Sequence, residues 1–223
     1  MEMQNFIWKF VSKDNAKPEL KGVYMDPEEK VAVATNANVM LVSHELYDES
    51  KAGMIVYKDG TSIRSGSRVK QSSGLYVTVR FPRWRSAIPQ DFYYRGEPRK
   101  KNSDGFYKEV LADAWLKDRI KAATRLNNTK GFSNVAVYFA AHTWVDPHYA
   151  EMMMSWSKDG WCIKHNTRAI INQKDNGDLM LVMPVLTLLN YNEPEKHGIS
   201  VYYTDEQKDT VMSVIKEFYL PVL

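Results

Sequence analysis

Cysteine is almost absent from the sequence: a single residue, Cys162, occurs among 223. One thiol cannot build an internal disulfide framework, which fits a reducing compartment, and we expect a cytoplasmic protein. Cys162 stands between Trp161 and Ile163. This apolar setting predicts a small buried residue rather than a nucleophile.

Long apolar runs are missing as well. No stretch of about 18 consecutive apolar residues occurs, so we expect no membrane-spanning helix and no membrane partner. The first residues, MEMQNFIWKF, lack a basic region followed by a long apolar one, and no signal peptide is predicted. With 44% hydrophobic and 26% charged residues, the chain has the composition of a globular protein of one large domain or two smaller ones.

The motifs of common catalytic sites are not found: there is no GxSxG, no P-loop and no GxGxxG. One group of metal-ligand residue types occurs, comprising His142, Asp146, His148 and Glu151. Its spacing matches no zinc pattern, and Pro147 is expected to break a helical pair of histidines. We predict a polar loop between strands and no bound metal. A metal-dependent enzyme using these four residues stays as an alternative.

Acidic residues are scarce between Arg64 and Lys101. This stretch contains ten basic residues but only Asp91 and Glu97 as acidic ones, a net charge of +8 in a chain whose total is +3. Such asymmetry indicates an anionic partner. Aromatic rings accompany the cations, a mixture that suits nucleic acids, in the clusters Arg83-Trp84-Arg85 and Tyr93-Tyr94-Arg95.

Residues 30–43, KVAVATNANVMLVS, give the clearest structural signal. Apolar residues alternate with smaller or polar ones in both halves of this segment, which is the period of two half-buried strands. Asn tolerates the left-handed conformation and can bond its own backbone, so Thr35-Asn36-Ala37-Asn38 predicts a tight turn. We therefore expect a hairpin that anchors the first sheet.

The rest of the chain predicts an α+β fold with meander sheets. Strands are predicted at 3–11, 22–25, 54–57, 75–81, 134–141, 149–157, 161–171 and 179–189. Helices are predicted at 13–20, capped by Ser12, at 105–126, and after the capping box Thr204-Asp205-Glu206-Gln207. Residues 61–74 are predicted to be a mobile basic loop, and residues 95–104 a linker.

Four segments together have the order and rough spacing of one known family. Residues 18–26, PELKGVYMD, are similar to a helix-to-strand pattern "aL.Gv", and residues 33–41, VATNANVML, stand in the place of "vATDgHrLa". Residues 81–89, FPRWRSAIP, are similar to "FPdyrrviP", and residues 179–185, LMLVMPV, to "vvMPm". In these segments the chain resembles the bacterial DNA polymerase sliding clamp, the beta subunit. Departures from the family pattern occur at Asn36, Asn38 and Met40.

The resemblance implies a DNA-clamp-like fold of two similar domains, each with a helix packed on an antiparallel sheet. Residues 1–97 would form the first domain, and residues 98–223 the second, with the C-terminal helix; the bacterial subunit has three domains. A sliding clamp performs no bond chemistry, so no enzymatic activity and no cofactor are expected. The implied partners are duplex DNA, peptides of polymerases or clamp loaders, and further copies of the chain.

Clamps are processivity factors in DNA replication. They hold the duplex backbone with cations on inner helices and do not read the base sequence. In this chain the corresponding helix is 105–126, where cations recur at every fourth residue and form one stripe. An ordinary solvated helix face is the other interpretation of this stripe. The residues predicted to contact DNA are Arg83, Arg85, Arg99, Lys100, Lys101, Lys108, Lys117, Lys121 and Arg125.

The same sequence also fits a second class of function. A protein-interaction module could keep the clamp fold without encircling DNA, and its apolar segments 186–189 and 219–223 would then line a pocket or dock as a tail. Core packing is the preferred role for both segments, because they are short and apolar.

Overall fold

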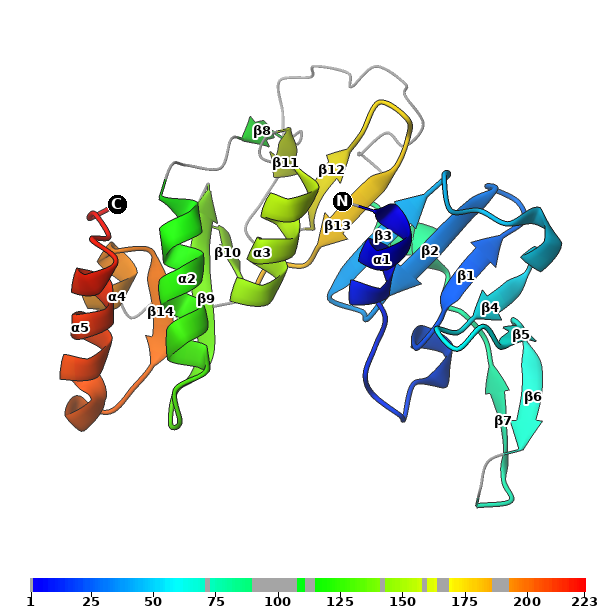
Figure 1. The fold of residues 1–223 in the computed structure, drawn as a ribbon, viewed down its shortest axis with the longest axis horizontal. Coiled ribbons are helices and arrows are strands. Elements are labelled where there is room, and N and C mark those ends of the chain that lie inside the picture. Colours follow the sequence, from blue (N-terminus) through cyan, green and yellow to red (C-terminus); the bar gives the residue numbers. More distant parts are fainter. Residues whose placement is uncertain are drawn as a thin grey trace. The chain divides into compact units, whose positions relative to one another are not determined.

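The computed structural model divides into two compact units. Unit 1 comprises Met1–Lys101 and Gln173–Val182, and unit 2 comprises Asn102–Asn172 and Met183–Leu223. Both units combine helices with antiparallel strands (Figure 1), which confirms the predicted α+β class. The predicted boundary at residue 97 lies outside the described residues and stays a prediction. The described residues are 2–70, 73–89, 108–110, 115–140, 143–157, 160–163, 169–185 and 193–223.

An antiparallel sheet forms the centre of unit 1. Its strands are β1 (Val23–Asp26), β2 (Val31–Thr35), β3 (Val39–Ser43), β4 (Met54–Val56), β5 (Ser62–Arg64) and β13 (Leu179–Val182). They lie in the order β5-β4-β1-β2-β3-β13. The predicted hairpin is therefore confirmed as β2 and β3, and β13, which is remote in sequence, pairs along the other edge of β3.

The β2–β3 hairpin is more deeply buried than its alternation predicted. All five residues of each strand are buried, because small Ala32 and Ala34 carry no polar group that would need solvent on the second face. At the turn, the Asn36 side chain accepts from the backbone N–H groups of Asn38 and Val39, each at 3.0 Å. The left-handed residue is Ala37, with φ of 79°, rather than either asparagine.

The N-terminal segment is helical, so the strand predicted at residues 3–11 is wrong. Met3–Phe6 form α1 and Ile7–Lys9 form a 3₁₀ turn. Phe6, Ile7 and Phe10 are all buried, and a separation of three to four residues between apolar side chains is helical spacing. The helix predicted at residues 13–20 is also wrong: only a 3₁₀ turn, Pro18–Leu20, forms there, because proline fits best at the start of a helical turn.

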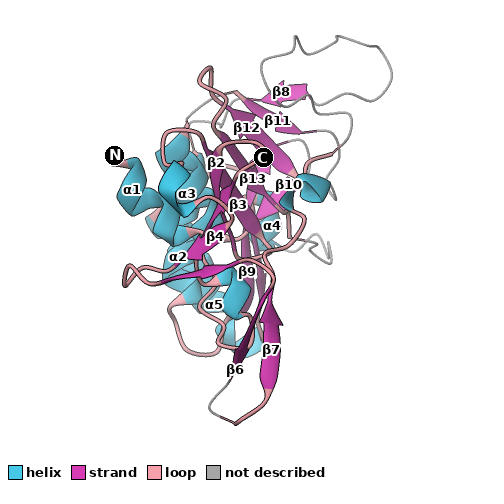
Figure 2. Ribbon diagram, turned by 90° about the vertical axis from the view of Figure 1, so that its right-hand side faces the viewer, coloured by secondary structure: helices cyan, strands magenta, loops and turns pink. Residues whose placement is uncertain are grey.

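A two-stranded ribbon replaces most of the mobile loop predicted at residues 61–74. Besides β5, this part of the chain forms β6 (Ser67–Lys70), which pairs with β7 (Tyr76–Val79). Gly66 adopts φ of 95° ahead of β6, a conformation that glycine adopts without steric cost. The β6–β7 ribbon is a sheet of its own and projects from the main sheet of unit 1 (Figures 1 and 2).

Unit 2 places helices on a second antiparallel sheet. That sheet has the order β10-β9-β14, and its members are β9 (Ser133–Ala140), β10 (Thr143–Val145) and β14 (Ile199–Tyr202). Another strand, β11 (Trp161–Ile163), pairs with β8 (Lys108–Val110) and with β12 (Ile170–Gln173). The helices of the unit are α2 (Leu116–Asn127), α3 (Pro147–Trp156), α4 (Glu193–Lys196) and α5 (Lys208–Glu217).

Three predictions for unit 2 need correction. The long helix 105–126 is shorter, because residues 108–110 are strand β8 and the helix begins at Leu116. Residues 149–157 belong to helix α3 instead of a strand, since Asp146 caps the helix and Pro147 occupies its first turn. Residues 161–171 contain two paired strands, β11 and β12, instead of one.

Two other local predictions are confirmed, the capping box and the burial of Cys162. The capping box is present before α5: the Thr204 backbone N–H donates to the Gln207 side chain at 2.9 Å, and the Thr204 side chain accepts from the Gln207 backbone. Cys162 is fully buried. Within the described part of the chain, no helix has both the length and the apolar character needed to cross a membrane. The predicted linker, residues 95–104, lies outside the described residues, as does the apolar segment 186–189.

Candidate nucleic-acid interface

Helix α2 carries an exposed stripe of positive charge. Lys117, Lys121 and Arg125 are all exposed, and they lie on one side of the helix because they are separated by four residues. The opposite side packs on β9 through buried residues, among them Leu116, Ala123 and Leu126. The sequence predicted that these cations form one stripe on the side of the helix away from its apolar face, and the structure confirms this position.

Two of the three cations in the α2 stripe have acidic neighbours. Lys121 lies 3.1 Å from Asp118, one turn away, and Arg125 pairs with Glu217 of helix α5. Lys117 makes no ion pair with any described residue. All four paired side chains are a third or more exposed, and exposed pairs contribute about 0–1 kcal/mol. A phosphate group can therefore replace either acidic neighbour at small cost.

Arg85 has a different environment from the α2 cations. Its guanidinium lies 3.4 Å from Asp26, 3.0 Å from Glu28 and 3.3 Å from Glu29. Asp26 also accepts from Trp84 Nε1 at 2.7 Å. Three carboxylates thus neutralise Arg85, and the network fastens residues 84–87 to the turn between β1 and β2.

Asp26 holds this turn together. It is 5% exposed, and its Oδ1 accepts from the backbone N–H groups of Glu28 and Glu29 at 2.8 and 3.1 Å. Burial is the largest cause that raises the pKa of Tyr24 above its ordinary value, and the nearby carboxylates of Asp26 and Glu28 raise this pKa further. Phe81 stacks on Tyr24 with ring centroids 5.0 Å apart. Trp84 and Phe81 are both buried and serve packing.

Arg83 lines a pocket of about 620 Å³ in unit 1. Arg85 and its partners Asp26 and Glu28 line the same pocket, and so do two more arginines, Arg64 and Arg80. Arg64, Arg80 and Arg83 are all exposed. None of them forms an ion pair with a described residue. Sequence reasoning missed Arg64 and Arg80 as functional candidates: Arg64 lies in the predicted loop 61–74, and Arg80 lies in the strand predicted at 75–81. A signal was present, since no Asp or Glu occurs from residue 60 to residue 90.

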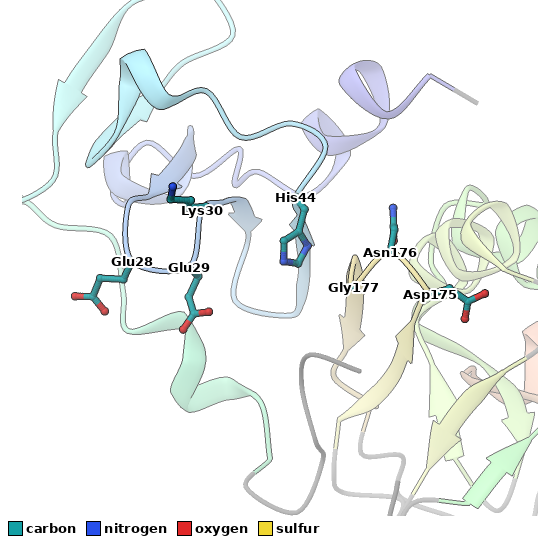
Figure 3. A pocket seen from close by; sticks show the side chains of 7 residues that line it. All are labelled: Glu28, Glu29, Lys30, His44, Asp175, Asn176 and Gly177. Atoms are coloured by element: carbon teal, nitrogen blue, oxygen red, sulfur yellow. The ribbon is translucent and has the colours of Figure 1, made fainter. Parts of the chain in front are cut away.

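A second hollow in unit 1 measures about 440 Å³, and its lining includes three acidic residues, a lysine and a histidine. Figure 3 shows Glu28 and Glu29 on the turn before β2, His44 directly after β3, and Asp175 on the turn before β13. His44 Nδ1 lies 3.5 Å from the buried Asp178 carboxylate. In the part of the chain that the structure describes, no group of three or more His, Cys, Asp or Glu residues is placed to hold a metal ion.

Some of the remaining predicted residues lie outside the described part of the chain. Arg99, Lys100, Lys101 and His142 lie outside the described residues, and of Lys108 only the backbone, in β8, is described. Asp146 uses its carboxylate to accept from the His148 backbone N–H at 2.8 Å. Asp146 therefore caps helix α3. His148 and Glu151 belong to that helix, and both are exposed.

Comparisons with known proteins agree with this architecture. No protein-family model matches the sequence, and no curated protein matches it. Among solved structures, the chain is similar to DNA polymerase III subunit beta from Borrelia burgdorferi, with a TM-score of 0.51, 16% identity, and 82% of this chain and 61% of that chain covered. For the beta sliding clamp of C. crescentus the TM-score is 0.50 at 12% identity, with 82% and 64% covered.

The protein thus spans less than two thirds of the length of either clamp structure. At such identities the likeness concerns the fold. The resemblance drawn from four short segments of sequence is confirmed at that level: this chain has the fold of the bacterial sliding clamp.

Proposed function

We propose that the protein associates with duplex DNA as a non-enzymatic, sliding-clamp-like protein and tethers proteins of replication or repair. The observation that carries the proposal is the α2 stripe in a chain with the clamp fold. Lys117, Lys121 and Arg125 face solvent, and two successive separations of four residues extend the stripe over about 12 Å of helix. Each DNA strand carries one phosphate per about 3.4 Å of helix axis, so a stripe of about 12 Å spans three to four phosphates of one backbone.

Binding of this kind holds DNA without reading its sequence. Lysine and arginine contacts to phosphate position a protein on the duplex and carry no base information. Of the other predicted contacts, Arg83 is exposed and available, whereas Arg85 would have to leave three carboxylates. Arg99, Lys100, Lys101 and Lys108 stay proposed contacts, as do peptide partners and further copies of the chain.

The salt dependence of DNA binding tests the proposal. We expect the K117Q/K121Q/R125Q variant to bind a 30-base-pair duplex more weakly than wild type. Its plot of log affinity against log salt should be shallower by about 2.7, because each lost phosphate contact removes about 0.9 from the slope. Fluorescence anisotropy at four salt concentrations gives both values.

The matched control removes the same charge elsewhere. Lys13, Lys17 and Lys58 are exposed in unit 1, and the K13Q/K17Q/K58Q variant is expected to keep the wild-type slope. An unchanged slope in the α2 variant, or an equal decrease in both variants, would refute the α2 stripe as the DNA contact. Absence of duplex binding at low salt would refute the proposed function itself.

The alternative function is an interaction module of the clamp fold that does not encircle DNA. The ion pairs of Lys121 with Asp118 and of Arg125 with Glu217 favour it, because they satisfy two of the three stripe cations without DNA. The two functions differ in whether the assembled protein encircles DNA. A protein that encircles DNA leaves it at an end, whereas a module that does not encircle DNA needs no end.

A further inference from the structure

The β6–β7 ribbon has two unlike faces. Its register pairs Arg68 with Thr78 and Lys70 with Tyr76, and side chains two residues apart on a strand share a face. One face therefore carries Arg68, Lys70, Tyr76, Thr78 and, as β7 ends, Arg80. All five are exposed. The other face carries Val69, Val77 and Val79, which are half-buried or buried.

The charged residues of the first face are all cations. Arg68, Lys70 and Arg80 form no ion pair with any described residue, and no acidic residue occurs anywhere from residue 60 to residue 90. Residues two apart along a strand are separated by about 6.7 Å, so the cations form a row along the ribbon. Such a row attracts a polyanion and is not neutralised by its own surroundings.

The same face also offers an aromatic surface. Tyr76 is 58% exposed, next to Leu75 at 68%. The Arg68 guanidinium lies 5.4 Å from the centre of the Tyr76 ring, which holds the ring in place by a cation–π contact. An exposed ring beside cations is the arrangement on which unpaired bases stack while phosphates pair with the cations.

The cationic row continues beyond the ribbon. Arg80 also lines the 620 Å³ pocket, which Arg64 and Arg83 share; the carboxylates of Asp26 and Glu28 in its lining pair with Arg85. A flexible chain that follows Lys70 and Arg68 along the ribbon therefore reaches two more guanidinium groups at the pocket. This path suits a bendable strand rather than a stiff duplex, in which stacked bases cannot reach Tyr76.

We propose that this face, formed by Arg68, Lys70, Tyr76 and Arg80 and continued by Arg64 and Arg83, binds single-stranded nucleic acid. The cations hold the phosphates and Tyr76 stacks on a base. The site is separate from the duplex contact proposed for helix α2, and it depends on different residues. The two sites can therefore be removed one at a time.

Oligonucleotide binding to the whole protein tests this site. With labelled (dT)₂₀ and U₂₀ in fluorescence anisotropy, the R68Q/K70Q/R80Q variant is expected to bind both at least tenfold more weakly. Its salt slope should fall by about 2, since each contact to a single strand contributes about 0.7. The K13Q/K17Q/K58Q variant should keep wild-type affinity, and a loss equal to that of the ribbon variant would refute the site.

Tyr76 separates base stacking from charge. We expect Y76A to weaken (dT)₂₀ binding about five- to hundredfold, and Y76F, which keeps the ring, to stay within about twofold of wild type. Because Tyr76 and the three ribbon cations are exposed, melting temperatures should be unchanged. Wild-type affinity in Y76A, or equal weakening of (dT)₂₀ and a 30-base-pair duplex in Y76A, overturns the single-strand assignment.

Two further comparisons distinguish this site from its rivals. K117Q/K121Q/R125Q is expected to keep its (dT)₂₀ affinity, whatever happens to its duplex binding. Poly-glutamate of matched charge is expected to displace (dT)₂₀ at least fivefold less effectively than unlabelled (dT)₂₀ does, because it has no base to stack on Tyr76. Equal displacement at equal charge concentration would mean that the ribbon binds any polyanion, and would overturn the proposal.

Discussion

Single buried carboxylates connect parts of unit 1 that are far apart in the sequence. Asp178 is fully buried and accepts from the His44 backbone N–H at 2.7 Å and from the Ser43 hydroxyl at 3.3 Å. It therefore joins the end of β3 to the residue before β13. Asp26 has the same role between the β1–β2 turn and Trp84. Buried polar groups of this kind are costly unless bonded, so both positions fix specific long-range contacts.

Ala37 offers a direct test of backbone strain. Its φ of 79° costs a residue with a Cβ about 1–2 kcal/mol, whereas glycine adopts this conformation freely but has more entropy in the unfolded chain. We expect Ala37→Gly to stabilise the protein by about 0.5 kcal/mol, measured by urea unfolding. Ala34→Gly, in strand β2, is the control and should destabilise. Destabilisation of similar size by both variants would contradict the strained turn.

At the scale of elements, the two sides of helix α2 have different environments. Its outward stripe faces solvent, and its inward face includes Arg119, which is only 1% exposed. The Arg119 side chain lies against Gly198, just ahead of β14. A Cβ on Gly198 would come within 2.5 Å of Arg119 Nε. The absence of a side chain at Gly198 therefore lets the helix lie close to the turn that leads into β14.

The close approach at Gly198 predicts an unequal pair of substitutions. Gly198→Ala should destabilise by about 3 kcal/mol, because it adds a clash with a buried side chain to the left-handed cost at φ of 77°. Gly60 has φ of 85°, and a Cβ added there would meet nothing within 4 Å, so Gly60→Ala should cost only about 1 kcal/mol. Urea unfolding of both variants measures the difference, and equal costs would contradict the contact with Arg119.

Elements with a strong local signal were predictable from the sequence. The β2–β3 hairpin has a turn that bonds its own backbone, and α5 has a complete capping box. Short apolar segments were not predictable, because the apolar residues of 3–11 and 149–157 are compatible with both the helical and the strand period. For the second segment, Asp146-Pro147 carried the decisive information, since this pair begins helices.

The candidate site was predictable only where it is local. The α2 stripe follows from a spacing of four residues, and its position is confirmed. The ion pairs of Arg85 with Asp26 and Glu28 join residues more than fifty positions apart, and no local pattern indicates them. The ribbon face was not predicted for another reason: the residues of β6 were assigned to a loop because they are polar and small, and only the pairing of β6 with β7 brings the cations of both strands to one side.

For the whole molecule, the proposed clamp-like function predicts how the protein would leave DNA. A protein that encircles the duplex and holds it through phosphates should slide and escape at ends. We expect the assembled protein to co-elute with a nicked circular plasmid in gel filtration at moderate salt, and to be lost when the plasmid is cut once. The reason is topological: an end removes the only barrier to sliding off.

A salt titration on the circular plasmid is the control for this prediction. Simple electrostatic binding weakens steeply with salt on circular and linear DNA alike. Equal retention on both forms would contradict a ring and favour the interaction module. Mass photometry of the free protein then reports the number of copies in the assembly.

Strand β13 has a consequence for how the protein is made. Its pairing with β3 joins Val182 to Val39, so the edge of β3 has no partner until residues 179–182 have been synthesised. At about 5–20 residues per second, this delay is on the order of ten seconds. During that time the nascent chain exposes an apolar strand edge of the kind that pairs with other chains. A ribosome-bound chaperone that shields this edge, or a permuted gene in which residues 174–182 precede β1, should therefore raise the soluble yield.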